Sequence, residues 1–164
     1  MTAAFEGRLL AEIAALNLPR PEDFVLNSSG ALAERGVIPM EEVGDIDGST
    51  TRANHTYLRT VLGWNVVHKE VGVSSDGSPI SVEITQDNAK RFDIHFWDFS
   101  VYDYNQTGRG RISLEEQKAC SEQDPATGIW VASLDYIERV KRDTGRPKDE
   151  QRLQAIRQFK NSQP

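Results

Sequence analysis

The chain has 164 residues, of which 38% are hydrophobic and 27% charged, which is ordinary for one globular domain with a hydrophobic core. No apolar run approaches the roughly 18 residues of a membrane span, and the N-terminus lacks the basic start and apolar run of a signal peptide. The net charge of −6 argues against extended DNA binding, which needs clustered Lys and Arg. The single cysteine, Cys120, excludes an internal disulfide and fits a cytoplasmic protein.

The first half of the chain is predicted to alternate short helices with short strands. Apolar residues at helical spacing, or in short runs between Gly and Pro breaks, indicate these elements. The predicted helices cover residues 5–16, 30–36 and 51–63, and the predicted strands cover residues 23–28 and 43–49.

The second half is predicted to be a β-rich centre followed by helices. The predicted strands cover residues 65–73, 79–85 and 90–100, with Asp76-Gly77 at the turn of a hairpin between the first two. A capping box of Ser113 and Glu116 predicts a helix start within residues 112–117. The remaining predicted elements are an extended piece over 129–132, a helix over 134–144 capped by Ser133, and a helix over 147–160 opened by Pro147.

Asp45-Ile46-Asp47 is the first candidate for chemistry. Because side chains alternate along a strand, the two carboxylates point the same way while Ile46 points into the core. Two neighbouring carboxylates repel each other when ionised, and a divalent cation such as Mg²⁺, which prefers oxygen ligands, removes that cost. The alternative is a surface loop in which two Asp residues flank one Ile.

The predicted strand over 90–100 offers a third acid. One face carries Phe92, Ile94 and Phe96, and the other carries Asp93, His95 and Trp97. Asp93 is favoured as the third metal ligand, while Glu83 competes because it also alternates with apolar residues. His95 has four open roles: a base, a ligand, a substrate contact, or a polar residue on the open face of a strand.

The order of these motifs resembles the nucleotidyltransferase superfamily of DNA polymerase beta, and it looks closest to the small stand-alone bacterial members. A strand and a short helix precede the Asp45-Ile46-Asp47 strand, and a later strand reads Arg91-Phe92-Asp93-Ile94. The resemblance implies an α/β (α+β) nucleotidyltransferase fold, in which helices flank a short mixed β-sheet and further helices follow. It also implies that Asp45, Asp47 and Asp93 bind two Mg²⁺ ions, with Mn²⁺ as a substitute, which orient an NTP and activate the attacking hydroxyl.

The tail VASLDYIERVKRDTGRPKDEQRL extends the resemblance. Lys141 matches a helix lysine of many small family members, which would neutralise charge on the triphosphate. The residues that match the following turn are Arg146, Lys148 and Asp149.

The Gly-Ser pair that holds the triphosphate in the family becomes Ser28-Ser29 here, so Ser28, Ser29 and Lys141 are the expected nucleotide-binding residues. A serine in place of the first glycine disfavours the positive φ that glycine allows.

Taken together, these features predict one domain over residues 1–164, with the sheet and acidic site in 20–100 and a C-terminal helical segment in 112–160. The predicted function is transfer of a nucleoside monophosphate from an NTP such as ATP to a hydroxyl or phosphate of a small molecule, a tRNA end or a protein. The altered Ser28-Ser29 pair keeps open a catalytically degenerate nucleotide-binding or regulatory protein. A third alternative is an interaction protein of the toxin–antitoxin type, with a partner protein or as a homodimer, and carboxylates more than about 10 Å apart would favour it.

Overall fold

The computed structural model describes residues 5–73, 79–95, 99–100, 112–144 and 147–163. Within these residues, a seven-stranded mixed sheet has the order β3-β4-β5-β2-β1-β9-β8. Its strands are β1 (Phe24–Leu26), β2 (Ile46–Thr50), β3 (Asn65–Val73), β4 (Pro79–Gln86), β5 (Phe92–His95), β8 (Ser121–Gln123) and β9 (Trp130–Ala132). A separate two-stranded ribbon pairs β6 (Phe99–Ser100) with β7 (Ile112–Ser113).

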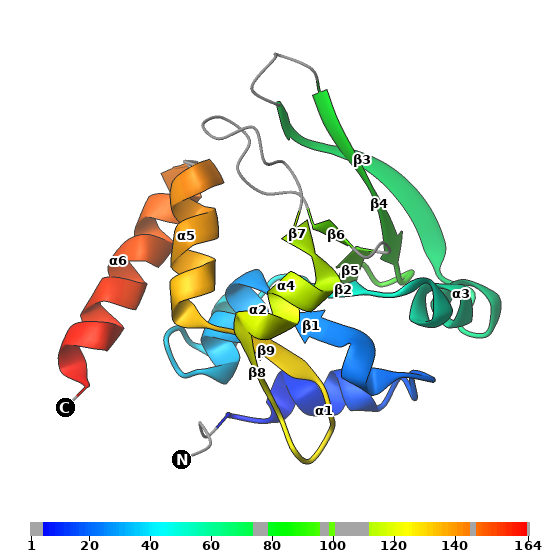
Figure 1. Cartoon of the computed structure of the whole chain (residues 1–164), viewed down its shortest axis with the longest axis horizontal. Coiled ribbons are helices and arrows are strands. Elements are labelled where there is room, and N and C mark those ends of the chain that lie inside the picture. Colours follow the sequence, from blue (N-terminus) through cyan, green and yellow to red (C-terminus); the bar gives the residue numbers. More distant parts are fainter. Residues whose placement is uncertain (1–4, 74–78, 96–98, 101–111, 145–146, 164) are drawn as a thin grey trace.

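Helices flank the sheet and form the C-terminal part of the fold (Figure 1). The α-helices are α1 (Arg8–Ala14), α2 (Ser28–Glu34), α3 (Arg52–Thr60), α4 (Leu114–Ala119), α5 (Leu134–Thr144) and α6 (Pro147–Ser162), and the short 3₁₀ turns are η1 (Pro21–Asp23) and η2 (Met40–Glu42). In Figure 1, α5 and α6 lie paired along one side of the molecule, and the β3–β4 hairpin extends along the other. The predicted α/β class, a mixed sheet with flanking and C-terminal helices, is confirmed.

The centre of the sheet brings three distant segments together. Strand β2 pairs antiparallel with β1 on one side and parallel with β5 on the other. In the parallel pair, Asp47 lies directly opposite Asp93 and Ile46 lies opposite Phe92. Strand β5 is therefore in register to place its acid beside the acid of β2.

The predicted elements of both halves are present, with differences that include the following three. Strand β2 begins at Ile46, so Asp45 precedes the strand instead of lying within it. The predicted strand over 90–100 is divided, because β5 ends at His95 and β6 belongs to the separate ribbon. Strand β8 was not predicted, because its three polar residues have no apolar pattern and only its pairing with β9 makes it a strand. Predictions at Asp76-Gly77, Phe96 and Trp97 lie outside the described residues.

The core occupies the face of the sheet opposite the acids. Ile46 and Ile94 are completely buried there, in one cluster with apolar residues of α1 and α2. Gly48 allows the ring of Phe24 to cross its strand, since a Cβ at this position would lie 2.4 Å from that ring. Alternation along β2 and β5 places Asp47, Ser49, Asp93 and His95 on the other face.

A buried carboxylate ties the first helix to the second. Glu34 of α2 is fully buried, and its side chain accepts hydrogen bonds from the backbone N–H groups of Gly7 (2.5 Å), Leu9 (2.6 Å) and Leu10 (3.3 Å). These donors belong to the first turn of α1, which has no other side-chain cap among the described residues. Glu34 thus holds α1 against α2.

Among the described residues, no helix combines the length and apolar character needed to cross a membrane.

Candidate metal centre

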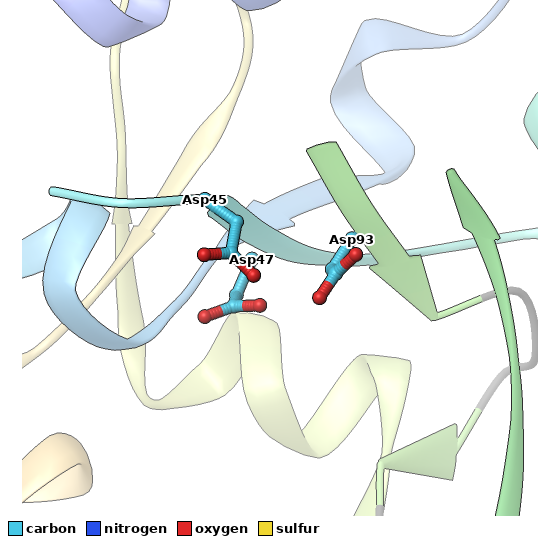
Figure 2. A group of neighbouring side chains, drawn as sticks. All are labelled: Asp45, Asp47 and Asp93. Carbon is cyan, nitrogen blue, oxygen red and sulfur yellow. The ribbon is translucent and has the colours of Figure 1, made fainter. Parts of the chain in front are cut away.

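Three aspartates form an acidic cluster at the edge of strands β2 and β5. Carboxylate oxygens of Asp45, Asp47 and Asp93, one from each, lie within 4.8 Å of one another. Figure 2 shows the three side chains projecting from the same side of these strands. Ile46 points to the opposite face and is fully buried, as the alternation along a strand predicts. The interpretation of Asp45-Ile46-Asp47 as a loop with unrelated acids is therefore not supported.

The cluster has the chemistry of a cation site. Three ionised carboxylates this close repel one another, and a divalent ion bound between them offsets that repulsion. Ligand oxygens around a single Mg²⁺ are roughly 3–4 Å apart, given its 2.0–2.1 Å bonds, so the observed spacing suits a shared ion. The cluster could hold a metal ion of this kind.

Asp93 is buried, and a neighbour on β4 holds its carboxylate. Asp93 is only 5% exposed. Its Oδ1 accepts a 2.7 Å hydrogen bond from Nε2 of Gln86, the residue opposite it on β4. Such a neighbour fixes the orientation of a metal-binding carboxylate. Glu83, the competing acid, lies three positions from Gln86 on β4 and therefore on the other face. Asp93 and not Glu83 completes the cluster in the described part of the chain.

Lys141 and Ser28 meet although they are 113 residues apart in the chain. The Nζ atom of Lys141, on α5, donates a 3.2 Å hydrogen bond to Oγ of Ser28 at the start of α2. The same Nζ lies 3.4 Å from Oδ1 of Asp149, on α6. Lys141 is 6% exposed and Asp149 1%, so this is a buried ion pair. The C-terminal helices thus contribute a cation to the beginning of α2.

Ser28 has a backbone conformation that usually requires glycine. Its φ is +55°, in the left-handed region, whereas the replacement of the family's glycine by serine predicted that positive φ would be disfavoured. Its neighbour Asn27 donates its backbone N–H to the carbonyl of Asp47 at 2.9 Å. The turn at Ser28 therefore adjoins the acidic cluster directly. Ser29, the other expected phosphate contact, is half-buried in the first turn of α2.

A buried polar group under α4 borders the site and was missed by sequence reasoning. Asn27 donates from Nδ2 to Oγ of Ser49 (3.1 Å) and to Oε1 of the fully buried Gln117 (3.5 Å). Oδ1 of Asn27 is buried and accepts no hydrogen bond from any described group. Since Asn27 adjoins Asp47, these contacts place α4 on the same side of the sheet as the acids. A polar residue before the Ser-Ser pair was the only available signal.

Two histidines, His95 and His55, lie on opposite faces of the sheet. His95 is half-buried on β5, opposite Ser49, on the same face as Asp93, and its role stays a prediction. His55 of α3 lies on the other face, where its Nδ1 and Oγ1 of Thr85 share a 2.5 Å hydrogen bond. Burial lowers the pKa of His55, and the charge of Arg59 lowers it further. These contacts are consistent with a structural role for His55.

Comparisons of the chain with protein-family models, with curated proteins and with solved structures found no match. The class of protein to which the chain belongs must therefore be argued from its fold and site. The two features that carry this argument are the paired acids of β2 and β5 and the contact of Lys141 with Ser28 beside them.

Proposed function

We propose that this protein is a metal-dependent nucleotidyltransferase of the DNA polymerase beta type. It would transfer a nucleoside monophosphate from an NTP to a hydroxyl or phosphate of an acceptor and release pyrophosphate. One observation carries the proposal: carboxylate oxygens of Asp45, Asp47 and Asp93 lie within 4.8 Å of one another on adjoining strands. This spacing does not favour an interaction protein with unrelated acids, for which separations above about 10 Å would be expected.

The acids would hold the metal. Asp45 and Asp47 would bind both Mg²⁺ ions, and Asp93 would bind the ion nearest the acceptor. Bound ions of this kind neutralise charge on the triphosphate and lower the pKa of a coordinated hydroxyl. Asp93 is held by Gln86, so its carboxylate keeps one orientation. The ligands are all oxygen atoms, and Mn²⁺ would substitute for Mg²⁺.

Residues at the start of α2 would hold the triphosphate. Ser28 and Ser29 supply hydroxyl and backbone N–H donors there, and Lys141 supplies a positive charge at 3.2 Å from the Ser28 hydroxyl. Asp149 fixes the ammonium group of Lys141 from the other side, at 3.4 Å. A cation aimed at the place where charge develops stabilises the transition state most effectively when it is held in advance.

Incubation with Mg²⁺, each α-labelled NTP and candidate acceptors tests the activity. We expect label to be transferred by the wild-type protein and lost in Asp45→Asn, because the variant removes a charged metal ligand. Asp135→Asn is the matched control, since this exposed acid on α5 lies outside the cluster. Equal transfer by the wild type and Asp45→Asn would contradict the proposal.

A second candidate function is a nucleotide-binding protein without catalysis. The conformation of Ser28 favours it, because a serine side chain at φ +55° crowds the position where glycine permits close approach to a phosphate. Calorimetry with Mg²⁺ and a non-hydrolysable NTP separates the two functions. Tight binding together with no label transfer to any acceptor supports the second candidate, and turnover excludes it.

A further inference from the structure

The three acids of the cluster differ in how their backbone is held. Asp47 and Asp93 lie within strands and face each other across a parallel pair. Asp45 is exposed and precedes β2, after the irregular residues Val43 and Gly44. A metal ligand outside regular structure needs another constraint, because precise ligand placement determines the affinity of a metal site.

Arg91 supplies contacts to this irregular segment. Its Nη1 donates to the carbonyl oxygen of Gly44 at 3.0 Å and to that of Val43 at 3.4 Å. Its own carbonyl accepts the backbone N–H of Ile46 at 2.7 Å. Arg91 therefore contacts the backbone on both sides of Asp45. The side-chain contacts are those to the carbonyls of Val43 and Gly44. A planar guanidinium with several fixed donors is suited to holding this segment, and the single ammonium of a lysine is not.

Glu12 holds the guanidinium in place from the other side. Nη2 of Arg91 donates to Oε2 of Glu12 at 2.9 Å, and Nε donates to Oε1 at 3.3 Å, so the pair is bidentate. Glu12 is on α1, which Glu34 anchors to α2. This arrangement links the helix that begins with Ser28 to the segment that carries Asp45.

The ion pair of Arg91 and Glu12 contributes little to the free energy of unfolding. The side chain of Arg91 is 33% exposed and that of Glu12 is 43% exposed. Exposed ion pairs contribute about 0–1 kcal/mol to stability, because solvent and salt screen them. Their geometric effect on a neighbouring segment does not depend on that small energy.

We propose that Arg91, oriented by Glu12, is a positioning residue that presets the Val43–Gly44 segment so that Asp45 completes the metal site. This inference rests on the proposed function, because it assigns Arg91 a role in the affinity of the metal site. Arg91 does not touch the metal or the substrate in this role. Its guanidinium acts through the carbonyl groups of Val43 and Gly44.

The test compares Arg91→Lys with wild type in binding of Mn²⁺ alone, followed by the loss of the free Mn²⁺ signal in electron paramagnetic resonance. Lysine keeps the positive charge near Asp45. A change in Mn²⁺ affinity therefore reports the loss of the guanidinium geometry and not an altered electrostatic field. We expect Arg91→Lys to bind Mn²⁺ about 10–100-fold more weakly, as other losses of supporting residues do. Arg20→Lys is the matched control, since Arg20 is an exposed arginine in an ion pair with Asp23.

A second measurement separates this inference from the proposed function. Hydrogen exchange of residues 43–47 should be faster in Arg91→Lys than in wild type and unchanged in Arg20→Lys, with the thermal midpoint preserved in both. If wild type and Arg91→Lys bind Mn²⁺ with equal affinity, the inference is overturned and the proposed function stays intact. If the wild type binds no Mn²⁺, the proposed function and the role of Arg91 in metal binding both fall. Weaker binding that accompanies global destabilisation would assign Arg91 a merely structural role and also overturn the inference.

Discussion

At the scale of single residues, Ser28 and the three aspartates place different demands on the chain. Ser28 adopts a φ of +55°, which costs an L-residue about 1–2 kcal/mol relative to a right-handed conformation. The clustered carboxylates repel one another in the absence of a cation. Unfavourable local features of this kind concentrate at functional sites, where the surrounding structure maintains them.

Replacing Ser28 separates backbone strain from the loss of its hydroxyl. Ser28→Gly and Ser28→Ala both remove the hydrogen bond from Lys141, but only glycine accepts positive φ without a steric cost. We expect Ser28→Gly to be about 1 kcal/mol more stable than Ser28→Ala in urea unfolding. Equal unfolding free energies for the two variants would show that the left-handed conformation at Ser28 is not strained.

Binding of a cation to the cluster should stabilise the folded protein. At a Mg²⁺ concentration of about 100 times the dissociation constant, the gain is about 2.7 kcal/mol, which corresponds to a rise in thermal midpoint of roughly 5–10 °C for a chain of this size. Asp47→Asn should lose this rise, and Asp135→Asn should keep it. A wild-type midpoint that does not respond to Mg²⁺ or Mn²⁺ would contradict the metal site.

At the scale of elements, α3 packs against the β3–β4 hairpin through a buried histidine. His55 is 3% exposed and shares a hydrogen bond with Thr85 of β4. Burial is the main cause that lowers its pKa from 6.5, Arg59 and Arg52 lower it further, and Glu83 opposes them. Burial at this contact between helix and hairpin therefore favours the neutral imidazole.

The lowered pKa of His55 predicts how stability depends on pH. Well above pH 6.5 the histidine is neutral in both the folded and unfolded states, so its contribution is fully present. As the pH falls below 6.5, the unfolded chain binds the proton more readily, and the free energy of unfolding decreases until the folded pKa is passed. We expect wild type to lose more stability between about pH 7.5 and 5.5 than His55→Asn does. Urea unfolding at both pH values measures this difference, and parallel losses in wild type and His55→Asn would contradict it.

Acidic groups elsewhere affect a different pH range. Burial raises the pKa of Asp23, but its bonds to Lys118 (2.7 Å) and Arg20 (2.6 Å) together bring it below 3.8. The hydrogen bond from Lys160 likewise lowers the pKa of Asp135 below 3.8. Stability from these two carboxylates is lost only as the pH falls through their folded pKa values, well below the range in which His55 acts.

At the scale of the whole molecule, Lys141 and Asp149 connect the C-terminal helices to helix α2. They form a buried ion pair between α5 and α6, and Lys141 also bonds to Ser28 of α2. Loss of one partner from a buried pair leaves a charge without compensation, which is far more costly than loss of a surface pair. The arrangement of these helices thus depends on the same lysine that is proposed to bind the nucleotide.

Asp149→Asn should destabilise the protein by about 3 kcal/mol or more. The exposed pair of Lys160 and Asp135, also between α6 and α5, provides the control, because Asp135→Asn should cost less than about 1 kcal/mol. The double replacement Lys141→Met with Asp149→Leu removes both charges and should regain most of the stability. Chemical denaturation measures all three, and a similar small cost for Asp149→Asn and Asp135→Asn would contradict the importance of the buried pair.

The features that depend on neighbouring residues were predictable. Alternation along a strand was enough to orient Asp47 away from Ile46, and the side chain of Ser113 does accept the N–H of Glu116 at 3.2 Å, as its capping box indicates. Helix boundaries near glycines also agree, with Gly36 and Gly63 at positive φ. Local chemistry was sufficient here because each feature is decided within a few residues.

The features that depend on long-range contact were decided by the tertiary structure. The choice of Asp93 over Glu83 needed the register of β5 against β2 and β4, which alternation alone cannot supply. Two further contacts join distant parts of the chain: the hydrogen bond of Lys141 to Ser28, and the bonds of Arg91 to Glu12 and Gly44. Sequence by itself determined the residue types and the direction in which they point. Only packing of the core, which brings distant segments into register, determined which of them meet.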